Sequence, residues 1–392
     1  MQSDLFMTKI ACVGAGQLAQ MLGIAATELG ITLRSAGKPG SCAFITCEAF
    51  TEDITDDLIL DNFLNGIDVF TFESEHEGLE YADRITALGV PIYPSPAFVH
   101  IAGDRLHEKT SLNDLGIPVA PFELIQPDAS PLLLEQYFAH LMSAQDLSPL
   151  GIVIKTRHGG YDGKGQWVIR TGENTDFARV VKEIAPVVAT PGCIVEGLVD
   201  FSMECSILAS RSRSGEIKTW PLTHNIHADS ILRYSTSPIT DVPNIEKLEE
   251  QAIDIVTKIC TEHDYVGTIA VECFVTSSGL VVNEIAPRVH NSGHWTIEGS
   301  STSQFEQHVR AITGMELGDT TCPGFVSMFN LIGQTVNSDA LDKIEGVFLH
   351  WYGKEVRPAR KVGHITIIGS TKSELESREQ KVKAILNHED LR

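Results

Sequence analysis

The sequence predicts a protein of mixed α/β and α+β class, with an N-terminal parallel α/β domain, a larger α+β domain and a small C-terminal domain. Strand-like and helix-like segments alternate over residues 8–95, which is typical of a parallel sheet. From about residue 97, helices are mixed with strands that follow one another across short Gly or Ser turns, which is typical of antiparallel sheets. A break at Cys322-Pro323-Gly324 is followed mainly by strand-like runs. We expect domains at 1–96, 97–315 and 316–392.

The individual elements follow from the spacing of apolar residues. In the first domain we expect strands at residues 9–13, 31–35, 67–72 and 90–93, and helices at 17–29 and 79–88. Pro94-Ser95-Pro96 is the expected linker. Later elements are helices at 104–115, 131–142 and 245–262 and strands at 325–331, 347–352 and 363–368.

Net charge and composition narrow the classes of function. The chain has 392 residues, of which 52 are Asp or Glu and 30 are Lys or Arg, for a formal charge of −22. Broad binding to nucleic acid or to an anionic membrane is not expected, because both need a basic face. No run approaches the roughly 18 apolar residues of a membrane span, and the N-terminus lacks the features of a signal peptide. The eight cysteines are scattered, so we expect a cytoplasmic protein with reduced thiols in its core.

A glycine-rich turn, Gly14-Ala15-Gly16-Gln17-Leu18-Ala19, follows the first strand and opens the first helix. It fits the relaxed dinucleotide-binding pattern, in which backbone N–H groups at a helix N-terminus face an anion. A true NAD site would place Asp or Glu at the end of the second strand, where this chain has Arg34-Ser35. A simple tight turn, an anion or phosphate site, and NAD binding stay open.

A second glycine-rich segment, at residues 155–165, lies between two strand-like runs. Its four glycines allow backbone N–H groups to approach phosphate oxygens, and Lys155, at a strand end, can reach a phosphate. It is not a Walker A loop, which would run through GxxxxGK[ST] into a helix. We expect a hairpin lid over phosphates, and a merely flexible hairpin is the alternative.

Two carboxylates lie opposite one another in a predicted hairpin. The apolar strands 267–275 and 280–286 flank a short turn, and centring that turn on Ser278 pairs Glu272 with Glu284. Directly opposed residues have Cβ atoms about 4.5–5.5 Å apart, so two carboxylates there need a counter-charge or a shared proton. We expect Mg²⁺, which commonly uses one or two carboxylates together with nucleotide phosphates. An acid/base dyad and a structural pair bridged by Arg or Lys stay open.

Positive charge is concentrated in two stretches of this acidic chain. Residues 151–170 and residues 354–361 each carry a net charge of +3. Residues 287–294, Pro-Arg-Val-His-Asn-Ser-Gly-His, directly follow the second carboxylate strand. These stretches fit two phosphate-bearing ligands, and a solvated basic face is the alternative for 354–361.

Together these features resemble the ATP-grasp fold of carboxylate–amine ligases. The match narrows on GGYDGKGQW at 159–167, PLTHNIH at 221–227, ECFV at 272–275, NEIAPRVHNSGHWT at 283–296 and WYGKEVRPARKVGH at 351–364. Their order and joint presence resemble the 5-(carboxyamino)imidazole ribonucleotide synthase family of purine biosynthesis. The resemblance implies an ATP-grasp fold with a Rossmann-like N-terminal domain, a lid subdomain at about 120–200, and a homodimer.

The resemblance also implies the reaction. In this family ATP and bicarbonate carboxylate 5-aminoimidazole ribonucleotide, through carboxyphosphate, with release of ADP and phosphate. Mg²⁺, or alternatively Mn²⁺, would be held by Glu272 and Glu284. No nucleic acid or membrane partner is expected.

The residues implied to bind ATP belong to the lid, to a hinge and to the carboxylate strands. They are Arg105, Lys155, Gly160, Tyr161, Asp162, Gly163, Lys164, Gly165, Gln166, Glu196, Gly197, Leu198, Val199, Glu204, His227, Asn283 and Glu284. Within this set the resemblance implies that Glu196 meets the adenine amine and Glu204 the ribose hydroxyls.

The residues implied to bind the ribonucleotide come from all three domains. They are Gln17, Leu18, Glu73, Arg288, His290, Asn291, Lys354, Arg360 and Lys361. Glu73 and Glu75 compete for one role, and the sequence does not decide between them.

The expected catalytic residues are Tyr161, Asp162, Lys164 and Arg288, with the first two orienting substrate and handling protons. Lys164 stands where many relatives carry Arg, which keeps the charge but loses the planar fork. A formate-dependent glycinamide ribonucleotide transformylase or another ATP-grasp ligase is the nearest rival, and the HNSGHW run favours the carboxylating family. An NAD-dependent oxidoreductase and a non-catalytic ATP-sensing module are the alternatives from other classes.

Overall fold

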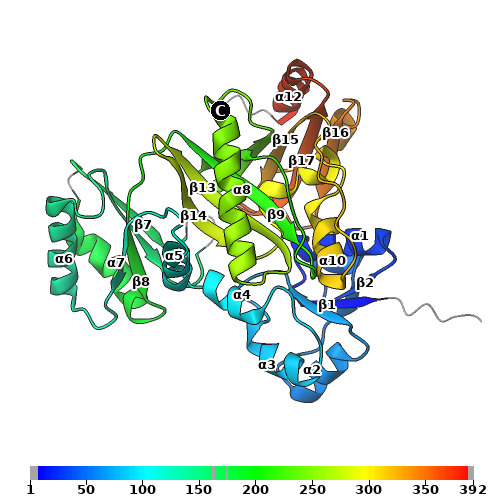
Figure 1. Cartoon of the computed structure of the whole chain (residues 1–392), viewed down its shortest axis with the longest axis horizontal. Coiled ribbons are helices and arrows are strands. Elements are labelled where there is room, and N and C mark those ends of the chain that lie inside the picture. The colour runs from blue at the N-terminus through cyan, green and yellow to red at the C-terminus, as the bar shows by residue number, and fades with distance from the viewer. Residues whose placement is uncertain (1–7, 161–163, 174, 387–392) are drawn as a thin grey trace, which may run out of the picture.

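The computed structural model describes residues 8–160, 164–173 and 175–386, which form three parts (Figure 1). Of the helices in these ranges, none has the length and apolar composition to cross a bilayer. All eight cysteines fall within these ranges and are free, and seven of them are buried. The prediction of thiols in the core is confirmed.

The N-terminal part is the predicted parallel α/β layer, with strand order β3-β2-β1-β4. All three strand pairs are parallel. The elements are β1 (Lys9–Val13), α1 (Gln17–Glu28), β2 (Thr32–Ala36), η1 (Cys42–Ile45), β3 (Glu48–Phe50), α2 (Asp57–Leu64), β4 (Val69–Phe72), η2 (Leu79–Tyr81), α3 (Ala82–Ala87) and α4 (Pro96–Ala102).

Two elements expected here differ in detail. Residues 90–93 do not form a strand, because Ile92 makes only an isolated bridge to Phe70. Pro91 and Pro94 flank that bridge, and proline has no N–H to donate to a ladder. The helix expected over 79–88 begins as the 3-10 turn η2 and becomes α-helical at Ala82.

A small antiparallel sheet forms a separate unit, at the left of Figure 1. Its strand order is β5-β8-β6-β7. The elements are β5 (Phe122–Ile125), α6 (Pro131–Ala144), β6 (Gly151–Thr156), β7 (Gln166–Arg170), α7 (Phe177–Ala189) and β8 (Cys193–Gly197). Phe138 of α6 and Ile184 of α7 pack with Ile154 of β6 in one core. The glycine-rich segment connects β6 to β7, so we call this unit the lid sheet.

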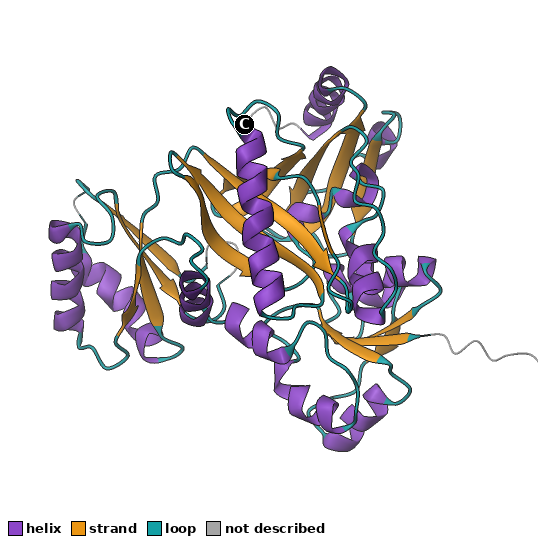
Figure 2. Cartoon of the chain, in the orientation of Figure 1, coloured by secondary structure: helices purple, strands orange, loops and turns teal. Residues whose placement is uncertain are grey.

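A nine-stranded sheet runs through the rest of the chain (Figure 2). Its order is β14-β13-β9-β11-β12-β15-β17-β16, with β10 on β9. The elements are α5 (Arg105–Asp114), β9 (Met203–Arg211), β10 (Ile217–Thr219), β11 (Thr223–Ala228), β12 (Ile231–Ser237), α8 (Ile245–Glu262), β13 (Gly267–Thr276), β14 (Gly279–Ala286), η3 (Asn291–Gly293), α9 (Thr296–Gly299), α10 (Gln304–Thr313), β15 (Phe325–Ile332), α11 (Ser338–Leu341), β16 (Val347–Trp351), β17 (Lys361–Gly369) and α12 (Lys372–Leu386). Tyr234 of β12 pairs with Phe329 of β15, so the C-terminal strands continue the preceding sheet.

Helix α8 crosses one face of this sheet (Figure 1). Its buried residues Ala252, Ile255, Val256 and Ile259 recur at intervals of three and four, which gives one apolar stripe. The stripe packs in one core with Ile207 of β9. This packing supports the part of the sheet that carries the two predicted metal-binding carboxylates.

Candidate active site

A cavity of about 750 Å³ lies where the lid sheet, the central sheet and the N-terminal part meet. The predicted site residues that line it are Gln17, Leu18, Arg105, Lys155, Gly160, Lys164, Gln166, Glu196, Gly197, Leu198, Val199, Glu204, His227, Glu272, Asn283, Glu284, Arg288, His290, Asn291 and Lys361. Glu73, Gly165, Lys354 and Arg360 do not line it. Tyr161, Asp162 and Gly163 lie outside the described residues.

The two carboxylates face each other as predicted, but through a different turn. Thr276 pairs with Gly279, so the connection is two residues long and is not centred on Ser278. With that turn alone, Glu272 would face residue 283. A bulge beside Glu272 inserts one extra residue in β14 and restores the pairing of Glu272 with Glu284.

A buried pair of ionisable residues on α5, Glu108 and Lys109, holds this bulge, and sequence patterns did not indicate it. Lys109 Nζ donates to the carbonyls of Asn283 at 2.7 Å and Val282 at 3.3 Å. Glu108 accepts the N–H of Ile285 at 2.5 Å, and burial raises its pKa to about 8. The available signal was the composition of α5, which has too few apolar residues to cover its inward face.

Lys155 and Glu196 face each other across the lid strands. Lys155 Nζ lies 3.0 Å from Glu196 Oε2 and 3.3 Å from Asn283 Oδ1, and Lys109 Nζ lies 3.6 Å from the same Glu196 oxygen. Burial opposes ionisation of Glu196, but the two lysines lower its pKa. Its Oε1 is buried without a partner, so one acceptor is left for a ligand.

Arg105 fastens the base of the glycine-rich hairpin. Its guanidinium donates to the carbonyls of Thr156, Gly159 and Gly160 at 2.8, 2.7 and 2.9 Å. Gly160 has a φ of 79°, and a Cβ there would lie 2.5 Å from the carbonyl oxygen of Lys164. Only glycine fits this position, and two guanidinium donors remain for a phosphate.

Glu204 and His227 line the cavity as one hydrogen-bonded pair. Glu204 Oε2 lies 2.6 Å from His227 Nδ1. Burial opposes protonation of the imidazole, but the hydrogen bond to Glu204 raises the pKa of His227. The pair therefore offers both an acceptor and a donor to a ligand.

Glu272 and Glu284 fit a hard divalent cation. Burial, and next the charge of Glu284, raise the pKa of Glu272 to about 7. The positive charge around the two carboxylates is therefore too small to compensate their own negative charge. His290 Nε2 lies 3.5 Å from Glu272 Oε1. Burial, and then the charge of Arg288, lower the pKa of His290 to about 3, so this histidine does not supply the missing positive charge. Within the described ranges no group of three or more His, Cys, Asp or Glu residues could hold a metal alone. A site of two carboxylates completed by phosphates agrees with this geometry.

The glycine-rich N-terminal turn binds an anion, and that anion is the carboxylate of Glu73. Its oxygens accept the N–H groups of Gly16 at 2.8 Å and Ala19 at 3.1 Å. A Cβ at Gly14 would lie 2.4 Å from Glu73 Oε2, which explains the glycine. The N-terminus of α1 is therefore occupied, which corrects the interpretation of this turn as a phosphate or NAD site. Glu73 faces the turn and not the cavity.

Glu75, the competing residue, does line the cavity. Its carboxylate accepts two hydrogen bonds from the guanidinium of Arg288, at 2.5 and 3.0 Å. Burial opposes ionisation, yet Arg288 lowers the pKa of Glu75 to about 2. Arg288 is thus held in a fixed orientation at the wall of the cavity.

The basic stretches reach the site only in part. Arg157 binds Asp104, and Arg357 binds Glu355, so these charges are compensated within the protein. Arg360 donates to the carbonyl of Glu355, and its side chain does not line the cavity. Arg157 nevertheless lines the cavity, whereas Arg357 does not. The role of Arg360 at the ribonucleotide stays a prediction.

Two lysines of the second stretch contact residues that line the cavity, and one of them, Lys361, lines it itself. The ammonium group of Lys361 contacts Asn291 Oδ1, and that of Lys354 contacts Gln17 Oε1. The C-terminal stretch thereby contacts the N-terminal part and the segment that follows β14. Burial lowers the pKa of Lys354.

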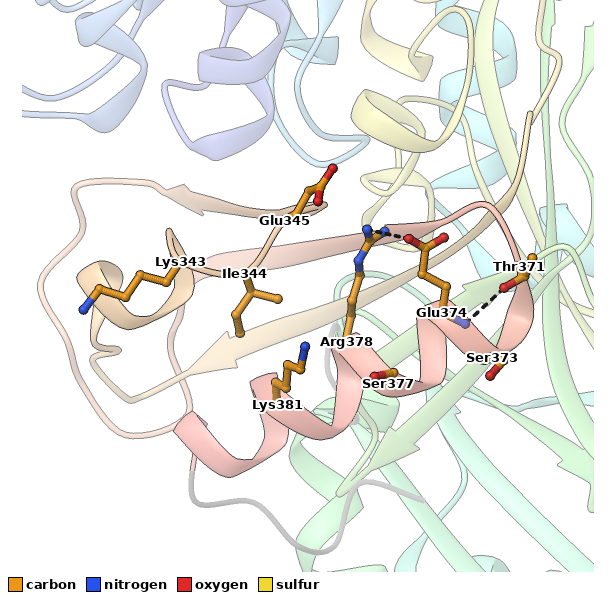
Figure 3. Close-up of a pocket in the computed structure, with 9 residues that line it drawn as sticks. All are labelled: Lys343, Ile344, Glu345, Thr371, Ser373, Glu374, Ser377, Arg378 and Lys381. Carbon is orange, nitrogen blue, oxygen red and sulfur yellow. Dashed lines mark hydrogen bonds and ion pairs between the residues drawn. The ribbon is translucent and has the colours of Figure 1, made fainter.

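A second hollow, of about 640 Å³, lies between α12 and the segment before β16 (Figure 3). Arg378 points toward Glu374, with which it pairs at 2.7 Å. No predicted site residue lines this hollow. The cavity between the three parts is therefore the candidate active site.

Comparisons with known proteins agree with this geometry. Family models match at residues 7–103 (ribonucleotide synthetase preATP-grasp domain), 110–305 (ATP-grasp domain) and 327–378 (phosphoribosylaminoimidazole carboxylase C-terminal domain). An N5-carboxyaminoimidazole ribonucleotide synthase of Pseudomonas aeruginosa is 38% identical over 379 residues, covering 96% of this chain and 99% of that protein. The predicted ATP-grasp fold and the family resemblance are confirmed.

Two solved structures extend the comparison. The N5-carboxyaminoimidazole ribonucleotide synthetase of Thermus thermophilus has a TM-score of 0.85 and 37% identity, over 97% of this chain and 99% of that one. A structure described as the ADP complex of such a synthetase has a TM-score of 0.83 and 31% identity, over 97% and 96% of the two chains. This chain belongs to the N5-carboxyaminoimidazole ribonucleotide synthase family.

Proposed function

We propose that this chain uses ATP and bicarbonate to carboxylate 5-aminoimidazole ribonucleotide, with release of ADP and phosphate, in de novo purine biosynthesis. The observation that carries the proposal is the cavity itself. It brings the pair Glu272–Glu284 and the lid lysine Lys155 together with Arg288 and Lys361. Two groups of charged residues in one cavity suit two phosphate-bearing substrates that must meet. The name of the family and the ADP complex of a relative support this reading.

The first step joins bicarbonate to the γ-phosphoryl group of ATP. A bicarbonate oxygen attacks the γ-phosphorus, the bond to the β-phosphate oxygen breaks, and carboxyphosphate and ADP form. Lys155 and Arg105 would bind the phosphates at the base of the hairpin, and Gly160 would bring backbone N–H groups close. Glu272 and Glu284 would hold Mg²⁺, which neutralises charge on phosphate oxygens when it is bound.

The nucleoside of ATP would lie along the lid hinge. We assign the adenine to the backbone of residues 196–199 and to the unpartnered oxygen of Glu196. Glu204, paired with His227, would accept hydrogen bonds from the ribose hydroxyls. Asn283, whose amide oxygen lies 3.3 Å from Lys155, links this half of the site to the phosphates.

The second step carboxylates the exocyclic amine of the ribonucleotide. The amine nitrogen attacks the carboxyl carbon, phosphate leaves and the amine loses one proton. Arg288, oriented by Glu75, and Lys361 would bind the anionic groups. A histidine with a pKa of about 3 is a poor proton acceptor, so we assign His290 to orientation. Asn291 and Gln17 would complete the pocket.

We infer further that the protein works in the cytoplasm as a homodimer, with domains at 1–96, 97–315 and 316–392. Free, buried thiols suit a reducing compartment. Size-exclusion chromatography with light scattering tests the assembly, and a monomeric mass would contradict it.

Phosphate release tests the proposed reaction. Release should require 5-aminoimidazole ribonucleotide and bicarbonate together, whereas dependence on glycinamide ribonucleotide and formate would indicate the transformylase. Glu284→Gln should abolish Mg²⁺-dependent release and keep the fold, because it removes one carboxylate of the pair. Glu216→Gln, on an exposed carboxylate paired with Lys218, is the matched control and should leave release unchanged. Full activity of Glu284→Gln would refute the metal assignment.

A further inference from the structure

One residue of the C-terminal motif, Tyr352, is not accounted for by the proposed reaction. It follows β16 and is 2% exposed. Its ring packs in the core cluster of the N-terminal part, with Leu18 and Ala43. A tyrosine of the C-terminal motif is thus buried in the core cluster against which Leu18, a residue lining the cavity, also packs.

The ring of Tyr352 lies next to the ammonium groups of two lysines, Lys354 and Lys361. Lys354 Nζ is 5.9 Å from the ring centroid, and Lys361 Nζ is 5.7 Å from it. An ammonium group within about 6 Å of an aromatic centroid is attracted by the ring quadrupole. The two ammonium groups repel one another, and the attraction of each to the same ring offsets part of that repulsion.

A row of hydrogen-bonded and stacked side chains fixes the orientation of the Tyr352 ring. Tyr352 Oη and His364 Nδ1 share a buried hydrogen bond of 2.6 Å. His364 stacks on His350 with centroids 4.3 Å apart and an angle of 8°, and His350 Nε2 lies 2.7 Å from Glu298 Oε1. Because this row is hydrogen-bonded at both ends, the ring of Tyr352 has little freedom to turn.

We propose that Tyr352 is a positioning residue, whose ring holds the ammonium groups of Lys354 and Lys361 together as one binding site for the anionic groups of the ribonucleotide. The inference rests on the proposed function in one respect, namely that these lysines meet that substrate. Gln17 contacts Lys354 and Asn291 contacts Lys361, so each ammonium group is held by an amide oxygen as well as by the ring.

Three replacements of Tyr352 separate the electrostatic role of the ring from its packing. Tyr352→Phe keeps the quadrupole and loses the hydroxyl. Pentafluorophenylalanine at the same position keeps the shape of phenylalanine and reverses the quadrupole. Tyr352→Leu removes the ring. Tyr234→Leu is the matched control, because Tyr234 also donates its hydroxyl to a partner, Glu379, and its ring packs against Phe329.

The expected result is a change in one Michaelis constant only. Tyr352→Leu and the pentafluoro variant should raise the KM for the ribonucleotide roughly tenfold, and that for ATP by no more than about twofold, since cation–π contacts are lost at one ligand only. Tyr352→Phe should stay within about threefold of the wild type. Tyr234→Leu should lower the melting temperature and leave both constants unchanged. Equal behaviour of the phenylalanine and pentafluoro variants would overturn the inference.

Calorimetry with ribose 5-phosphate provides a second measurement that does not need turnover. The wild type should bind it, and the pentafluoro variant should bind it roughly tenfold more weakly. Equal binding, or none in the wild type, would refute the assignment of an anion site framed by Tyr352. Binding of ribose 5-phosphate without ribonucleotide-stimulated phosphate release would instead refute the proposed function and leave the anion site in place.

Discussion

Replacing Lys109 by methionine should destabilise the protein strongly, because the bulge in β14 depends on it. Lys109 is 1% exposed, and its ammonium group donates to the partly buried carbonyl of Asn283 at 2.7 Å and to the buried carbonyl of Val282 at 3.3 Å. Methionine fills a similar volume but donates nothing. Each buried carbonyl left without a donor costs about 1–3 kcal/mol, and Glu196 also loses one of its two lysines. We expect Lys109→Met to lower the free energy of unfolding by about 3–5 kcal/mol.

Urea unfolding followed by tryptophan fluorescence measures this loss. The matched control is Lys258→Met, because Lys258 is an exposed lysine that pairs with Asp254 one helical turn away. A surface pair of this kind contributes about 0.5 kcal/mol. If Lys109→Met unfolds at the same urea concentration as Lys258→Met, then Lys109 does not hold the bulge and the reasoning fails. If the loss is found, Mg²⁺-dependent phosphate release should fall with it, since Glu284 loses its register.

Two further predictions concern the N-terminal part. Gly14→Ala should lower the free energy of unfolding by about 1–3 kcal/mol more than Gly40→Ala. Both glycines have a positive φ, 98° and 82°, but only at Gly14 would a Cβ meet the carboxylate of Glu73, so equal losses would show that the contact does not matter. Glu75→Gln should cost on the order of 3 kcal/mol near neutral pH, because Arg288 lowers the Glu75 pKa from 4.5 to about 2. A carboxylate whose pKa is lowered in the fold stabilises it fully above the pKa of the unfolded chain, 4.5, and loses this effect as the pH falls toward about 2. The difference between wild type and Glu75→Gln, measured by urea unfolding, should therefore shrink from about pH 5 toward about pH 2; a difference that grows on acidification would contradict the pairing.

The sequence predicted the carboxylate pair correctly although it placed the turn wrongly. The two strands are nearly continuous apolar runs that contain one glutamate each, so pairing them across any short turn brings Glu272 and Glu284 close together. Such runs do not reveal a bulge. The two-residue turn shifts the register by one, and the bulge beside Glu272 shifts it back. The pairing of Glu272 with Glu284 therefore survived an error in the local geometry.

Other features could not be read from the sequence because they depend on contacts between distant segments. Lys109 and Asn283 are far apart in the chain, and neither segment carries a sequence pattern that indicates their contact. Glu73 resembles a site residue in sequence, since it follows a buried strand, but in the fold it caps α1. Tyr352 belongs to a motif that indicates the family, but the motif does not show that Lys354 and Lys361 both lie near the tyrosine ring in the fold.

The pairing of β12 with β15 joins the C-terminal strands to the sheet that carries the ribonucleotide half of the cavity, so this half should move less than the ATP half beside the lid sheet. Arg288 and Asn291 closely follow β14, and Lys361 begins β17, so all three are fastened to one continuous sheet. In the part of the chain that the structure describes, no strand of the lid sheet pairs with a strand of that sheet, although the side chain of Lys155 on β6 donates to Asn283 on β14. A rotation of the lid would therefore reshape the ATP half while the ribonucleotide half keeps its form. Amide hydrogen exchange should accordingly be slow throughout β12, β15 and β17, and the ribonucleotide should find its pocket already assembled, whichever way the lid stands.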